Sequence, residues 1–427
     1  MATPLRPARL REAHAHLLMH GEAMDAVQLA DCTSADDLLA RMAARADATP
    51  SDRNESGGVW IVGVGARPEA WASPAWPSLA RFDEAVRGRP AIAWCFDTHA
   101  LLASSAALRA AGIDRATPDP EGGVILRTTD GSPTGVVLES AAKQVAAARP
   151  SPTSEQRLAS LRAALADLKA HGFVEVHDLK ARPTLGPDLA RLSDAGELDM
   201  DVRLYVPFEE LESALDAAED WTRENVRLAG AKLFADGTLN SRTAWMLEPF
   251  ADPIPGHERG TPLVTPEQLL AAVGVCDDLG VPLAVHAIGD GAVRAVLDAI
   301  ERVRPSTLGF RVEHAELIDE ADVPRFAALG VLCSVQPCHL LYDIEALRRL
   351  LPGRLDRVMP LRELIESGCE PGHLLWFGSD VPIVRPHPED SIRAAVHRRR
   401  EGMPEAAAIA PDQAIEEADA WAAFEAL

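Results

Sequence analysis

The sequence predicts an α/β protein, a (β/α)₈ barrel of the TIM type with a subdomain inserted after its first strand. From about residue 157 onward, short apolar runs alternate with stretches of helical length, which is the pattern of repeated βα units around a parallel sheet. A length of 427 residues suits such a barrel with one elaboration. An open doubly wound sheet is the alternative, but no Gly-rich phosphate loop follows the first apolar run.

Eight apolar runs are the expected barrel strands. They are Leu10–His16, Gly172–His177, Asp201–Val206, Val226–Phe234, Val281–Ala287, Phe310–His314, Gly330–Gln336 and Leu374–Phe377. Between them lie helical patterns, such as Glu155–Ala170, with leucines three and four residues apart, and Pro266–Leu279, which Thr265 precedes as an N-cap. A further helical stretch is expected over Pro411–Leu427.

The region between the first two strands does not repeat this rhythm. It is rich in turn residues and contains two strand-like pieces, Val59–Gly63 and Ala91–Phe96. We therefore expect three parts: residues 1–30 with the first barrel strand, an inserted mixed α/β subdomain over residues 31–150, and the rest of the barrel over residues 151–427. A subdomain that covers the barrel mouth could contact substrate.

Composition excludes several classes of function. A net charge of −23 argues against a nucleic-acid partner, which clustered Lys and Arg would bind. The sequence has no apolar run of membrane-spanning length and no secretory signal, so we expect a cytoplasmic protein without membrane contact. Six scattered cysteines without a CxxC pair are interpreted as reduced thiols.

Polar residues, most of them of types that ligate metals, fall at or near the ends of the expected strands. They are His14, His16, Lys232, His286, His314 and Asp380. The carboxyl ends of all strands of a (β/α)₈ barrel meet on one face, so these residues would meet there. Burying a histidine side chain without a hydrogen-bond partner costs a few kcal/mol of stability. A divalent cation shared by several histidines would act as that partner. In an HxH pair on a strand, both imidazoles point to the same side.

Several motifs in this order closely resemble the amidohydrolase superfamily, specifically amidohydrolase family 3, the relatives of N-substituted formamide deformylase. The motifs in the barrel are REAHAHL, AKLFADGTLNSRTA, LAVHAIGD, RVEHAEL, VQPCH and FGSDVP. Those in the inserted region are WIVGVG, FDTHALLASSAALRAAGI and PDPEGGVILRTTDGSPTGVVLE. The resemblance covers nearly the whole chain.

This resemblance implies one or two divalent ions, zinc first among them. His14 and His16 would hold one ion, and His286 and His314 would hold a second ion or complete the first site. Lys232 would be carboxylated to a carbamate (N6-carboxylysine) that links two ions, unless it is an ordinary partner of Asp236. Asp380 would bind metal and accept the proton of the attacking water, unless it is only a helix cap.

The resemblance also implies residues that face the substrate, namely His99, Asp236, Arg242 and His339. Against this, Asp236-Gly237 is a common turn pair, and His339 can cap a strand. His177 and Asp178 end the second strand and are expected to support the site rather than bind metal.

One departure from the family concerns its small β-sandwich, which is built from segments before the HxH motif and after the last helix. Only 13 residues precede His14, so we expect the sandwich to be absent. A homodimer could then bury the barrel surface that the sandwich covers. Glu12 stands where the family has an aspartate.

The leading hypothesis for function is a metal-dependent hydrolase that cleaves a C–N bond in an amide, formamide or cyclic amide. The alternatives are a metal-dependent esterase or lactonase, and a non-catalytic barrel that binds a small molecule.

Overall fold

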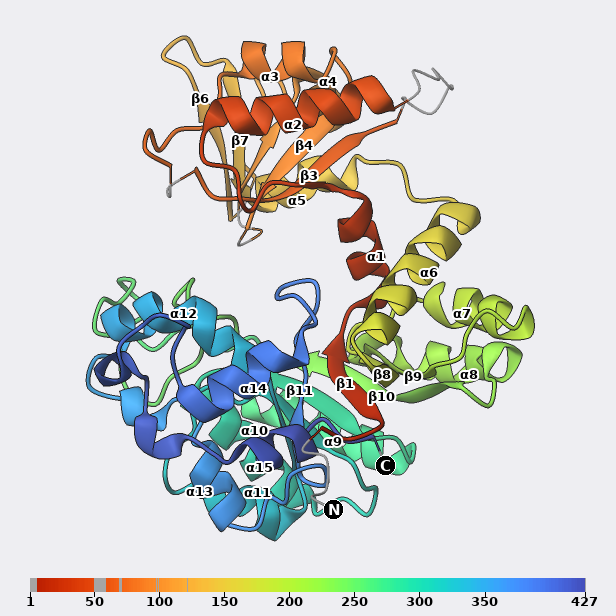
Figure 1. Cartoon of the computed structure of the whole chain (residues 1–427), viewed down its shortest axis with the longest axis vertical. Helices are drawn as coiled ribbons and strands as arrows, with labels where there is room; N and C mark the ends of the chain where they lie inside the picture. Colours follow the sequence, from red (N-terminus) through yellow and green to blue (C-terminus); the bar gives the residue numbers. More distant parts are fainter. Residues whose placement is uncertain are drawn as a thin grey trace. The chain divides into compact units, whose positions relative to one another are not determined.

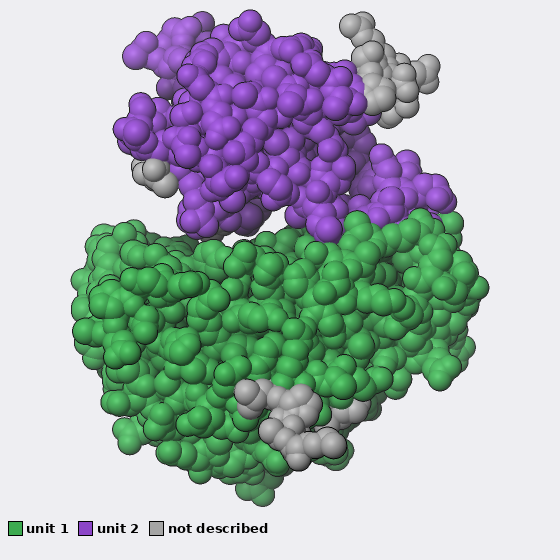
Figure 2. Space-filling view, in the orientation of Figure 1, with its two compact units in different colours: residues 1–20, 161–427 green, residues 21–160 purple. Residues whose placement is uncertain are grey.

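A computed structural model of the protein describes residues 6–49, 59–68, 71–96, 98, 100–120 and 122–426. The chain divides into two compact units, shown in different colours in Figure 2. The first unit comprises residues 1–20 and 161–427, and the second comprises residues 21–160. Each unit is described by itself below.

The first unit is built on an eight-stranded parallel sheet in the order β1-β8-β9-β10-β11-β12-β13-β14 (Figure 1). The strands are β1 (Leu10–Ala15), β8 (Phe173–Asp178), β9 (Asp201–Pro207), β10 (Val226–Phe234), β11 (Leu283–Ala287), β12 (Arg311–His314), β13 (Leu332–Val335) and β14 (Leu375–Phe377). All eight expected strands are confirmed. Most of their residues are buried, as expected of parallel strands covered by helices, and β10 is the most exposed of them.

The barrel closes where β1 meets the segment that follows β14. The amide of His16 donates to the carbonyl of Val381 at 2.9 Å, and the amide of Asp380 donates to the carbonyl of His14 at 2.8 Å. Towards the start of the two strands, a C-terminal segment, Ala423–Ala426, lies between them. The amide of Arg11 donates to the carbonyl of Phe424 at 2.6 Å, and the amide of Phe377 donates to that of Ala423 at 3.0 Å. We call this junction the seam.

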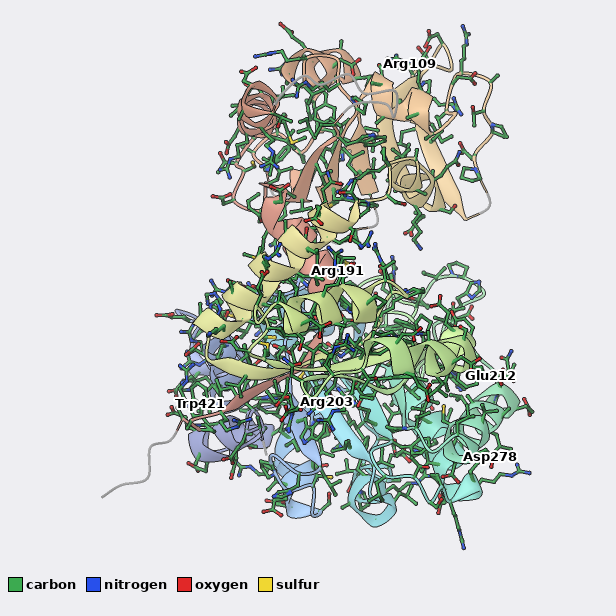
Figure 3. The ribbon with its side chains drawn as sticks, turned by 90° about the vertical axis from the view of Figure 1, so that its right-hand side faces the viewer. Arg109, Arg191, Arg203, Glu212, Asp278 and Trp421 are labelled. Atoms are coloured by element: carbon green, nitrogen blue, oxygen red, sulfur yellow. The ribbon has the colours of Figure 1, made fainter. Side chains whose placement is uncertain are left out.

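Helices accompany the strands of the barrel, and exposed side chains such as Arg191, Glu212 and Asp278 stand on them (Figure 3). The helices are α1 (Leu17–Asp25), α6 (Ser154–Ala170), α7 (Leu185–Asp194), α8 (Leu211–Trp221), α9 (Pro266–Asp278), α10 (Asp290–Val303), α11 (Val323–Leu329), α12 (Pro337–Leu350), α13 (Leu361–Glu366), α14 (Pro388–His397) and α15 (Glu417–Ala422). Thr265 caps α9 in a capping box with Gln268, which confirms the predicted start of that helix.

The expectation of a helix over Pro411–Leu427 is wrong except for α15. A 3₁₀ turn occupies Pro411–Gln413, and the helix spans only Glu417–Ala422. The following residues leave the helix because their backbone groups bond to the two strands at the seam. Tertiary pairing therefore outweighs the helical preference of this alanine-rich stretch.

The second unit has its own six-stranded sheet in the order β2-β3-β4-β5-β7-β6. The strands are β2 (Val27–Gln28), β3 (Ile61–Ala66), β4 (Ala91–Cys95), β5 (Ala100–Ala103), β6 (Gly123–Arg127) and β7 (Pro133–Glu139). β2, β3 and β4 are parallel, and the remaining pairs are antiparallel. The helices are α2 (Ala35–Ala48), α3 (Leu79–Ala85), α4 (Ser105–Ala110) and α5 (Ser140–Ala147).

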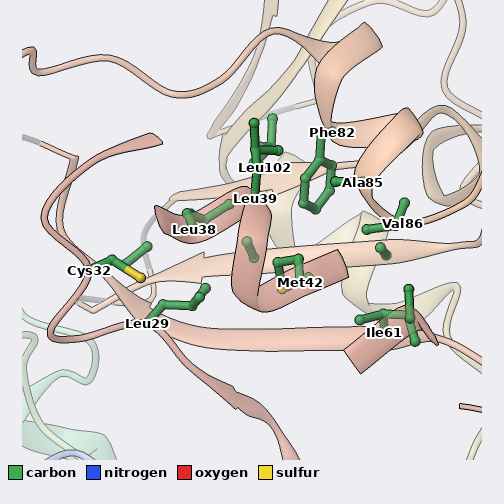
Figure 4. Close-up of a cluster of buried hydrophobic side chains, with 14 of the residues drawn as sticks. Leu29, Cys32, Leu38, Leu39, Met42, Ile61, Phe82, Ala85, Val86 and Leu102 are labelled. Atoms are coloured by element: carbon green, nitrogen blue, oxygen red, sulfur yellow. The ribbon is translucent and has the colours of Figure 1, made fainter. Parts of the chain in front are cut away.

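Two hydrophobic clusters form the core of the second unit. One contains Leu38 and Met42 of α2 with Phe82 of α3 (Figure 4), and the other contains Leu108 of α4 and Val145 of α5. Because each cluster uses different helices against the same sheet, this unit carries a core of its own.

Within the described ranges, no helix combines the length and apolar character that a membrane crossing requires. The two sheets described above include every named strand among the described residues, and no β-sandwich accompanies the barrel there.

Candidate metal centre

The strand ends bring the predicted metal-binding residues together. His14 lies in β1, Lys232 in β10, His286 in β11 and His314 at the end of β12, and Asp380 follows β14. The ring centroids of His14 and His314 are 4.9 Å apart, and those of His286 and His314 are 4.4 Å apart. Residues separated by hundreds of positions therefore share one end of the barrel.

Three of these residues form a cluster with the donor set of a metal site. His14, His314 and Asp380 each offer one ligand atom, and these atoms lie within 4.8 Å of one another. His314 Nδ1 and Asp380 Oδ1 are buried and have no hydrogen-bond partner among the described residues. Such atoms are costly unless a ligand satisfies them, and imidazole with carboxylate suits a zinc-type ion. The residues present therefore fit a divalent cation.

His16 reaches the same carboxylate, although β1 ends at Ala15. The Nε2 atoms of His14 and His16 lie 3.4 Å and 3.0 Å from Asp380 Oδ1, without hydrogen-bond geometry. The pairing of β1 with β8 is irregular between Glu12 and Ala15, so simple strand alternation does not describe the HxH pair. Both imidazoles nevertheless face Asp380, which is what a shared ion requires.

The backbone at the site is also unusual. His314 has φ 70° and Asp380 has φ 61°, both in the left-handed region. Non-glycine residues there cost roughly 1 kcal/mol each, and such strain concentrates at functional sites.

Burial sets the charge of the site's imidazoles. It lowers the pKa of His14 to about 4 and that of His286 to about 3, so both rings are neutral near pH 7. Burial alone would raise the pKa of Asp380, but the neighbouring His14 and His16 outweigh it and hold the pKa well below its ordinary value. The site thus offers neutral nitrogens and an ionised carboxylate, the states that bind metal.

Lys232 is buried with no hydrogen-bond partner for its Nζ atom among the described residues. Nζ lies 5.1 Å from the centroid of the Phe234 ring. Burial is the main reason that the pKa of this amine falls to about 8. Asp236, the alternative partner considered for it, accepts hydrogen bonds elsewhere.

The substrate-facing predictions fall in different surroundings. Asp236 accepts hydrogen bonds from the amides of Trp245, Ile288 and Gly289, at 2.8, 3.0 and 2.9 Å, which ties two loops at the rim together. Arg242 donates to the Asp252 carboxylate at 2.9 Å.

His339 lies in the first turn of α12. Its Nε2 is 3.1 Å from the carbonyl oxygen of Ser379, and its ring centroid is 6.0 Å from that of His314. His99 lies outside the described residues. The substrate roles of Asp236, Arg242, His339 and His99 stay predictions.

Several supporting residues were missed from sequence. Glu313 Oε2 lies 2.7 Å from His14 Nδ1, and the fully buried Arg311 binds the other oxygen of Glu313. The signal was present, because the RVEH strand carries three polar residues among four positions that are all buried.

Glu12 is a second buried carboxylate that was not predicted as part of the site. It accepts hydrogen bonds from the amides of His14 and Ser379, at 3.0 and 2.9 Å, and so spans the seam. Of the residues expected to support the site, His177 contacts Arg311, and Asp178 accepts from the amide of Leu17 at 2.7 Å.

The fold is that of barrel hydrolases. It superposes on an uncharacterized metal-dependent hydrolase from Pyrococcus horikoshii with a TM-score of 0.78, at 24% identity, covering 96% of this chain and 78% of that one. A similarly described structure from Pyrococcus furiosus gives a TM-score of 0.75, also at 24% identity, covering 96% and 79%.

The chain belongs to the amidohydrolase family, whose model matches residues 10–423. Among its relatives is YtcJ of Bacillus subtilis, which bears the name of an amidohydrolase, at 30% identity over 91% of this chain and 72% of YtcJ. Another is the protein LONG AFTER FAR-RED 3 of Arabidopsis thaliana, which is 31% identical over 91% of this chain and 68% of its own length. N-substituted formamide deformylase of Arthrobacter pascens is 25% identical over 85% and 68%.

Proposed function

We propose that this amidohydrolase-family protein hydrolyses a C–N bond in an amide, formamide or cyclic amide, with one or two divalent ions, zinc first among them. The observation that carries the proposal is the convergence of His14, His314 and Asp380, of which His314 and Asp380 hold buried atoms that no described residue supplies with a hydrogen-bond partner. The similarity to a formamide deformylase supports the choice of a C–N bond.

His14, His16, His314 and Asp380 would hold the first ion, and His286 with Lys232 would contribute to a second. A divalent ion at this site would polarise a carbonyl oxygen and lower the pKa of a water molecule. Lys232 would act as a carbamate, since the neutral amine is the form that combines with carbon dioxide. A pKa of about 8 leaves an appreciable neutral fraction near pH 7 to 8.

Asp380 would carry the proton in this reaction. Its carboxylate is ionised and sits between the imidazoles of His14 and His16. It would accept a proton from the attacking water and return it to the nitrogen of the departing amine. Because a carboxamide cannot accept that proton, Asp380→Asn should reduce kcat/KM for an amide substrate at least 10³-fold.

The experiment compares Asp380→Asn with Asp298→Asn, a change of an exposed carboxylate that pairs with Arg325. Activity would be measured on matched amide and ester pairs, with bound metal determined by elemental analysis. Unchanged amide turnover in Asp380→Asn contradicts the role of Asp380. Turnover of the esters alone would replace the C–N assignment by an esterase or lactonase.

A further inference from the structure

We propose that Glu313 is a positioning residue that fixes the proton of His14 on Nδ1 and thereby aims the free electron pair of Nε2 at the cation. The inference rests on the proposed metal site, and it concerns a residue that would not itself touch the ion. Arg311 belongs to the same device because it holds Glu313 in place.

The contact between Glu313 and His14 determines the tautomer of the imidazole. Glu313 Oε2 and His14 Nδ1 are 2.7 Å apart, and the exposed fractions of the two side chains are 0% and 2%. Two acceptors cannot share so short a buried contact, so the proton must lie between them, on Nδ1. A neutral imidazole then carries no proton on Nε2.

The freed nitrogen faces another acceptor. His14 Nε2 lies 3.4 Å from Asp380 Oδ1, an oxygen without a hydrogen-bond partner among the described residues. With Nε2 unprotonated, nothing in the pair can donate a hydrogen bond. A cation is the group that satisfies both atoms, so the Glu313 contact prepares this side of the ring for metal.

Arg311 fixes the carboxylate from behind. Its Nε donates to Glu313 Oε1, and its Nη2 donates to the carbonyl of Ala13 at 2.6 Å and to Ser334 Oγ at 3.0 Å. Both charged side chains have an exposed fraction of 0%. Because Arg311 binds Oε1 of Glu313, only Oε2 is available to His14. The bonds of Arg311 to Ala13 and Ser334 fix its own position, and so that of Glu313, relative to β1 and β13.

The side chain of the neighbouring Gln336 is compatible with a proton on His14 Nδ1 when its amide group is rotated by 180°. Its Nε2 is 3.3 Å from His14 Nδ1, and its Oε1 has no hydrogen-bond partner among the described residues. Rotating the amide by 180° turns the oxygen towards the proton on Nδ1 and gives this oxygen a partner, in exchange for the 3.4 Å hydrogen bond that Nε2 donates to the carbonyl of Ser334.

The test measures zinc affinity of the full-length protein by competition with a chromophoric chelator. Glu313→Gln should weaken zinc binding 10- to 100-fold, the range typical for loss of a partner behind a ligating histidine. The matched control is Asp167→Asn. Asp167 Oδ2 also binds a buried histidine, His20 Nε2, at 2.9 Å, but that histidine is not a proposed ligand and the pair has no contact with Arg311 or Glu313 among the described residues. The control should stay within about 3-fold of wild type.

Two further measurements separate the possible failures. If Glu313→Gln does not fold, Glu313→Asp, which keeps a charge for Arg311 but withdraws it from His14, should weaken zinc in the same way. Nitrogen-15 NMR of the metal-free wild type should show the His14 proton on Nδ1. A proton on Nε2, or a folded variant with wild-type zinc affinity, overturns the inference. If wild type binds zinc but cleaves no amide, the proposed function fails while Glu313 keeps its role.

Discussion

At the scale of single residues, the buried polar side chains of the barrel form hydrogen bonds with one another. These bonds leave a few specific atoms, such as Asp380 Oδ1, without a partner among the described residues. His177, which is not one of the proposed metal ligands, is an example. Its Nδ1 accepts from Arg311 Nη1 at 2.9 Å, and its Nε2 donates to Glu175 Oε1 at 2.7 Å. These contacts need the neutral ring, because a proton on Nδ1 would face the guanidinium. Burial is the main cause that lowers its pKa to about 4.

This arrangement predicts a loss of stability in acid. The unfolded chain protonates His177 near pH 6.5, while the folded protein resists until about pH 4, so the free energy of unfolding falls as pH drops through this window. His177→Gln keeps an acceptor and a donor but does not titrate. Between pH 7 and pH 5, it should gain about 2 kcal/mol relative to wild type, measured by urea unfolding. If the free energies of unfolding of the two proteins change with pH in parallel, the prediction is wrong. The control is His373→Gln, at an exposed histidine, which should follow wild type.

Lys232 leads to a prediction of opposite effects on stability and on metal binding. Its amine is buried without a hydrogen-bond partner among the described residues and has its pKa lowered to about 8, against 10.5 in the unfolded chain. The folded state therefore pays a penalty that is complete below pH 8 and disappears by about pH 10.5. In metal-free, carbon dioxide-depleted buffer at pH 7, Lys232→Met should be about 1–3 kcal/mol more stable than wild type.

The same variant should bind less metal per chain by elemental analysis, because a thioether cannot form a carbamate. Lys169→Arg, at an exposed lysine that pairs with Asp199, is the control. A variant that is destabilised, or that keeps its full metal content, would show that the amine has another partner in the protein.

At the scale of elements, the barrel strands could be predicted because they are short apolar runs separated by helical patterns, and several of them carry or precede a proposed ligand residue. The four strands β2, β5, β6 and β7 of the second unit were not predicted. β6 in particular is half exposed, and its apolar run of three residues, between turn-rich stretches, is shorter than the runs that indicate a buried strand. The C-terminal residues were misassigned because their place between β1 and β14 depends on tertiary contacts, among them the hydrogen bond from the amide of Arg11, near the other end of the chain, to the carbonyl of Phe424.

Gly378, at the seam between β14 and Asp380, leads to a prediction for this element. A Cβ atom there would lie 2.7 Å from both Glu12 Oε1 and the amide nitrogen of His14. Gly378→Ala should therefore separate β1 from the Asp380 segment, cost about 1–3 kcal/mol of stability and weaken zinc binding. Gly274→Ala is the matched control, because Gly274 lies inside α9 with nothing within 4 Å of the added Cβ. A Gly378→Ala protein with wild-type stability and zinc affinity would show that the seam can absorb the methyl group.

At the scale of the whole molecule, the sequence predicted the barrel and the meeting of its strand ends, because the rule for parallel barrels places all carboxyl ends on one face. It did not predict the hydrogen bond between Glu313 and His14 or the contacts by which Arg311 holds Glu313. Nothing in a sequence states which of several buried charges will face one another, since that depends on strand register and side-chain direction. The sequence also predicted an inserted subdomain, over residues 31–150, and the contacts of the structure group residues 21–160 into a compact unit.

The seam has a consequence for the protein as the ribosome makes it. Glu12 and Ser379, which form hydrogen bonds across the seam, are 367 positions apart in the sequence. His14 and Asp380 are separated by nearly the same length of chain. A polypeptide still under synthesis can form helices and early strands, but it cannot bring the proposed metal ligands together until Asp380, which follows the last strand, has emerged. Metal capture would thus come late in biogenesis, and interrupted translation products would be catalytically inert.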